Sequence, residues 1–65
     1  MDNRCVSLVH DILYGNFSDE EWLGVKQRFD VFMSTATDAE TQEIEESGAG
    51  DTIHMIYAGI MNKRK

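Results

Sequence analysis

Proline is absent from this 65-residue chain, and cysteine occurs once, at Cys5. A lone cysteine excludes an internal disulfide, and without a CxxC pair or a CxxC…HxxxH spacing the sequence predicts no structural zinc site. A chain this short buries only about 60% of its unfolded surface, so its core alone stabilises it marginally. Helix packing and self-association remain as sources of stability. The sequence therefore predicts one helical domain over residues 1–65, stabilised by oligomerisation and without a cofactor.

Basic residues are also scarce: six Lys and Arg stand against twelve Asp and Glu, which gives a formal net charge of −6. Nucleic-acid phosphates and anionic lipid surfaces repel such a chain. Direct binding to nucleic acid or to a membrane is therefore disfavoured, whereas a protein with a basic surface is a suitable partner. The chain also lacks a long apolar run and a signal-peptide pattern, which together with the single thiol predicts a cytoplasmic protein.

Apolar residues recur at helical spacing, and alternation of β-branched residues is weak, so the sequence predicts an all-α fold. We expect a compact bundle of three main helices, at about residues 3–14, 19–34 and 52–63, in a homo-oligomer. Asp2 or Asn3 is the expected cap of the first helix. Its broad apolar face comprises Cys5, Val6, Leu8, Val9, Ile12 and Leu13.

The start of the second helix is the best-defined local signal in the chain. Ser18 and Glu21 have the spacing of a capping box, in which each side chain accepts a hydrogen bond from the other residue's backbone N–H. Phe17, just before the cap, and Trp22 are spaced as a hydrophobic staple. The core stripe that follows is rich in aromatic residues and comprises Trp22, Val25, Phe29, Phe32, Met33 and Ala36.

The connector to the last helix is acidic, and residues 38–51 contain no Lys or Arg. Thr37 and Glu40 repeat the capping-box spacing, so the connector begins either a new helix or a bent continuation of the second one. Ile44 is its only large apolar residue, so we expect it to contribute little to the core. Residues 47–50, Ser-Gly-Ala-Gly, are predicted to end it as a flexible loop.

The last helix is expected to begin at Asp51 or Thr52, and its central part, from Thr52 to Asn62, contains no charged residue. Its core face comprises Ile53, Ile56, Tyr57, Ile60 and Met61. A helix without charge on any side is usually buried on more than one side. We therefore predict a homo-oligomer interface, in a dimer on symmetry grounds, that comprises Met55, Ala58, Gly59 and Asn62 with Leu23 and Val31 of the second helix.

Several patterns that would indicate chemistry are absent. His10 and His54 have no His or Cys at ligand spacing, and the acidic connector lacks the calcium-loop pattern of an EF-hand. Residues 48–52 precede a helix but lack the Gly-Lys-Ser/Thr ending of a phosphate-binding loop. Cys5 is expected to pack as a small apolar residue. The sequence thus predicts no metal site and no enzyme.

The leading hypothesis is a small acidic, non-enzymatic interaction protein, of the type made by phages and mobile elements, that inhibits or regulates a protein partner. The residues expected to bind the partner are Asp38, Glu40, Glu43, Glu45 and Glu46. A plainer interpretation is that these acids only keep an oligomer soluble. The alternative function is a homo-oligomer that sequesters a small anionic, nucleotide-like ligand at a subunit boundary, with counter-charges from Lys26, Arg28 and the Lys63–Lys65 tail.

Overall fold

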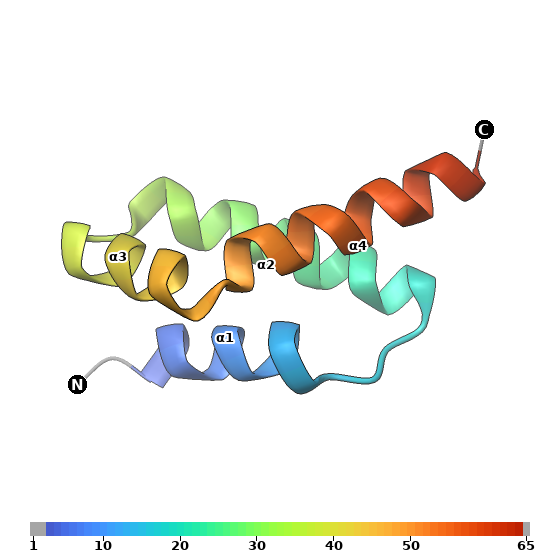
Figure 1. The fold of residues 1–65 in the computed structure, drawn as a ribbon. Coiled ribbons are helices and arrows are strands. Elements are labelled where there is room, and N and C mark those ends of the chain that lie inside the picture. Colours follow the sequence, from blue (N-terminus) through green and yellow to red (C-terminus); the bar gives the residue numbers. More distant parts are fainter. Residues whose placement is uncertain (1–2, 65) are drawn as a thin grey trace.

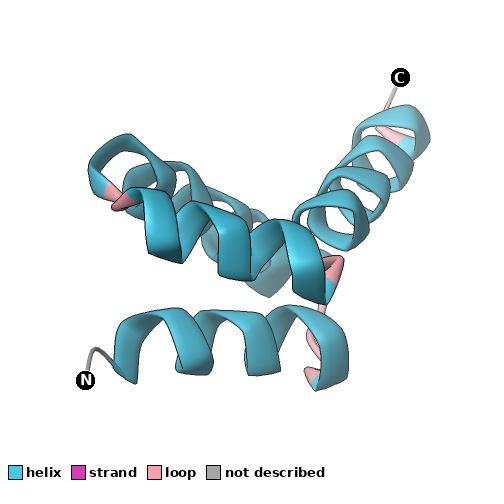
Figure 2. Ribbon diagram, turned by 60° about the vertical axis from the view of Figure 1, so that its left-hand side comes forward, coloured by secondary structure: helices cyan, strands magenta, loops and turns pink. Residues whose placement is uncertain are grey.

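The computed structural model describes residues 3–64, and every regular element within them is a helix (Figure 1, Figure 2). The helices are α1 (Asn3–Tyr14), α2 (Asp19–Thr35), α3 (Asp38–Ser47) and α4 (Ala49–Lys63). The predicted all-α fold is confirmed. Within these residues there are four helices instead of three main ones, because the acidic connector, for which the sequence left a helix open, forms a helix of its own. Asp2, one of the two expected caps of α1, lies outside the described residues.

Helix α4 is the element on which the others converge. It contacts α1, α2 and α3, and its C-terminal turns extend past the end of α1 (Figure 1). Two ion pairs tie these turns to the start of α2: Lys63 Nζ lies 3.1 Å from Asp19 Oδ2, and Arg64 bonds to Glu20. Each pair joins a base at a helix C-terminus to an acid at a helix N-terminus, which is the arrangement that both helix dipoles favour.

The core lies where the first three helices meet α4, and it confirms most of the predicted apolar faces. Val6 is the exception, since 58% of its surface is exposed. The apolar face predicted for α1 was too broad, because residues at its margin turn away from the neighbouring helices. The buried cluster comprises Cys5, Leu8, Ile12, Val25, Phe29, Phe32, Ile44, Ala49 and Ile53.

The start of α2 has the predicted capping box and staple. The Glu21 N–H donates to Ser18 Oγ at 3.3 Å, and the Ser18 N–H donates to Glu21 Oε1 at 3.1 Å. The rings of Phe17 and Trp22 meet edge to face, with their centroids 5.0 Å apart. Hydrogen bonds from the backbone and then the side chain of Ser18 lower the pKa of the Glu21 carboxyl below its ordinary value of 4.5.

Ser18→Ala is expected to lower the free energy of unfolding by about 1 kcal/mol at neutral pH, which is typical for the loss of a helix N-cap. Because the folded state lowers the pKa of Glu21, its carboxylate stabilises the fold above pH 4.5, and this contribution is lost as the pH falls through the folded pKa. The difference between variant and wild type should therefore shrink in acid. Urea denaturation of both proteins at neutral and at acidic pH measures this difference. The control is Ser34→Ala, at an exposed position outside any N-cap, which should change the free energy of unfolding little.

A single residue separates α3 from α4, so the flexible loop predicted over residues 47–50 is wrong. Gly48 has a left-handed backbone with φ of 78°, and its N–H donates to the Glu45 carbonyl at 3.3 Å. Ala49 already belongs to α4 and is fully buried, and its N–H donates to Ser47 Oγ at 3.2 Å. The left-handed glycine turns the chain within one residue, and α4 consequently begins at Ala49 instead of Asp51 or Thr52.

Candidate functional site

The acidic segment is a separate, capped helix. The Glu40 N–H donates to Thr37 Oγ1 at 3.2 Å, and Glu40 Oε1 accepts the Thr37 N–H at 2.9 Å. Of the two possibilities that the sequence left open, a new helix is therefore the observed one. Ile44, only 2% exposed, holds α3 against the core. The helix is thus fixed at its N-cap, at Gly48 and by one buried side chain.

Four of the five predicted partner-binding acids are exposed on α3. Helical spacing places Glu46 opposite Ile44 and the other three about 100–120° around the helix from it, and Glu46 accepts a hydrogen bond from Gln42 at 3.0 Å. Glu40 differs, because it is half-buried and one of its oxygens belongs to the cap. We call the exposed set the α3 acidic face; it consists of Asp38, Glu43, Glu45 and Glu46.

The net charge of the protein resides in this part of the chain. Residues 38–51 hold six acids and no base, so the remaining six acids and six bases cancel. Four basic side chains in the described part of the chain are each paired with a carboxylate outside 38–51. The pairs are Lys26–Asp30, Arg28–Asp11, Lys63–Asp19 and Arg64–Glu20.

The residues predicted to form an oligomer interface fall into separate groups. Met55 is 75% exposed, and Ala58, Gly59 and Asn62 are exposed beside it on α4. A Cβ added at Gly59 would meet nothing within 4 Å. We call these four residues the outer face of α4.

The two α2 residues of the predicted interface lie on different flanks of their helix. Leu23 is half-buried and lines a groove with Tyr57 and Met61 of α4. Val31, 62% exposed, borders a second groove together with Ser7 of α1. The structure therefore does not bring Leu23 and Val31 into one strip with the outer face of α4.

The basic groups expected for an anionic ligand do not converge either. Lys26 Nζ lies 2.7 Å from Asp30 Oδ2 and 4.8 Å from the Tyr57 ring centroid, on the α4 side of α2. Arg28 lies on the other side, with Nη2 at 2.7 Å from Asp11 Oδ2. The tail residues Lys63 and Arg64 are paired at the start of α2, and Lys65 lies outside the described residues.

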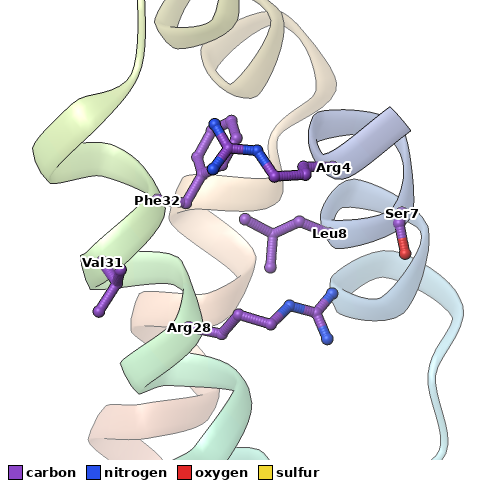
Figure 3. Close-up of a pocket in the computed structure, with 6 residues that line it drawn as sticks. All are labelled: Arg4, Ser7, Leu8, Arg28, Val31 and Phe32. Atoms are coloured by element: carbon purple, nitrogen blue, oxygen red, sulfur yellow. The ribbon is translucent and has the colours of Figure 1, made fainter. Parts of the chain in front are cut away.

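Sequence reasoning missed a groove of about 400 Å³ between α1 and α2 (Figure 3). Its position depends on how the two helices pack, which no local pattern reports. The Arg28–Asp11 pair at one side of it joins residues 17 apart in the sequence. In the sequence, the available signal was Arg4 and Leu8, a basic and an apolar residue spaced one turn apart on α1. The groove is lined by Arg4, Ser7, Leu8, Arg28, Val31 and Phe32.

The two histidines and the cysteine pack against other parts of the protein. The His10 and Tyr14 rings lie one turn apart, tilted by 51° with centroids at 5.3 Å, the His54 ring meets Phe29 edge to face at 6.0 Å, and Cys5 is buried. Among residues 3–64, no group of three or more His, Cys, Asp or Glu side chains is placed to hold a metal ion.

The described helices are all too short or too polar to cross a membrane. Two surfaces of the described chain are candidates for binding a partner, the α3 acidic face and the groove between α1 and α2. When the chain is compared with protein-family models, curated proteins and solved structures, none of them matches it.

Proposed function

We propose that this protein is a small cytoplasmic, non-enzymatic interaction protein that inhibits or regulates a protein partner by covering a basic surface with the α3 acidic face. One observation carries the proposal: the whole formal net charge of −6 belongs to residues 38–51, and four of the described basic side chains pair with carboxylates elsewhere. An acidic helix in a segment that contains no base is suited to a basic partner.

The anchoring of α3 supports the same function. Because both helix ends are capped and Ile44 is buried, we expect binding to order few additional backbone groups, and this reduces the entropic cost of association. A concentrated negative field also speeds the encounter with a basic surface, and this rate enhancement falls with ionic strength. We therefore expect fast association that weakens with added salt, in contrast to an acidic helix that serves only solubility.

Reversing the charges of Glu43, Glu45 and Glu46 to lysine tests the proposal. Each of the three is exposed, so the helix should form as before, while the affinity for the partner should fall by at least about 100-fold, at roughly 1 kcal/mol per reversed charge. Pull-down with the tagged protein from its native host identifies the partner, and titration calorimetry then compares the variants. Circular dichroism checks that the helical signal is retained.

A matched pair of variants separates local charge from total charge. The three glutamates are changed to glutamine in one protein, and Asn16, Gln27 and Ser34, all exposed outside α3, are changed to lysine in the other. Both proteins then carry a formal charge of −3 instead of −6. Only the α3 variant should lose affinity. Equal binding by the charge-reversed protein and the wild type would rule out the α3 acidic face as the contact.

We further propose that the protein acts as a homo-oligomer, a dimer by default, through the outer face of α4. Support comes from the exposure of Met55, the lack of charge between Thr52 and Asn62, and the open space beside Gly59. Small residues such as Ala58 and Gly59 allow the backbone of a second helix to come close. A dimer would present two acidic helices to its partner and thereby increase the apparent affinity.

A further inference from the structure

We draw no further inference here: the strongest candidate, the groove between α1 and α2 that Leu8, Val31 and Phe32 line, carries none, because Arg28 beside it is already paired with Asp11 and nothing in the structure shows what covers it.

Discussion

Replacing Ile53 with alanine is expected to lower the free energy of unfolding by about 3 kcal/mol, within the usual range for deleting a buried isoleucine side chain. Ile53 is fully buried in the core on α4, the helix that contacts the other three. At roughly 0.05–0.15 kcal/mol per residue, a chain of this length has only about 3–10 kcal/mol in total. The variant should therefore retain at most about 7 kcal/mol, and it should be about half unfolded at room temperature if the wild type lies at the low end of this range.

Urea and thermal denaturation followed by circular dichroism measure this loss. The matched control is Val6→Ala, since Val6 is also β-branched and helical but is 58% exposed. It should change the unfolding free energy by no more than about 0.5 kcal/mol. A variant at Ile53 that unfolds with the wild-type midpoint would show that the helices are not held together through α4.

Gly59→Leu is expected to convert the proposed dimer into a monomer without harming the fold of that monomer. A side chain at this position meets nothing within 4 Å in the single chain, and leucine favours a helix over glycine by roughly 0.8 kcal/mol. In the dimer, the same side chain would separate two helices that approach closely at Ala58 and Gly59. The dissociation constant should rise at least about 100-fold, which corresponds to 2.7 kcal/mol or so.

Sedimentation velocity at several protein concentrations measures this change. The wild type should sediment above the 7.4 kDa of one chain and the variant at that mass. Gly24→Leu is the matched control, because Gly24 is also a helical glycine with nothing within 4 Å of an added Cβ. It should leave the dimer intact. A wild type that sediments at the monomer mass would refute the dimer, and dissociation by Gly24→Leu alone would move the interface from α4 to α2.

Local and periodic signals predicted most of the fold. The capping boxes at Ser18 and Thr37 depend on residues three apart, so they could be read directly from the sequence. The stripe of α2 and the bounds of α1 also follow from short-range spacing. The α3–α4 corner could not be predicted in this way. A cluster of serine and glycine resembles a loop by composition, whereas the burial of Ala49 depends on packing against the rest of the chain.

The two candidate surfaces could be predicted only as far as they depend on local sequence. The α3 acidic face was visible as a run of acids without a base, although composition alone did not establish that α3 is a fixed helix. The Arg28–Asp11 and Arg64–Glu20 pairs join residues 17 and 44 apart in the sequence. Such contacts form only when the helices are packed, so neither these ion pairs nor the groove between α1 and α2 could be derived from spacing.

The one-residue corner at Gly48 has a consequence for how this protein can change in length. One residue added to or removed from α3 near the corner would rotate the preceding part of the helix by about 100° relative to α4. Ile44 would then leave the core, and a carboxylate of the α3 acidic face would turn toward it. Substitutions on the outside of α3 are therefore tolerable in evolution, whereas insertions and deletions beside Gly48 are not. The number of residues in α3 therefore matters more than their identity for keeping the α3 acidic face exposed.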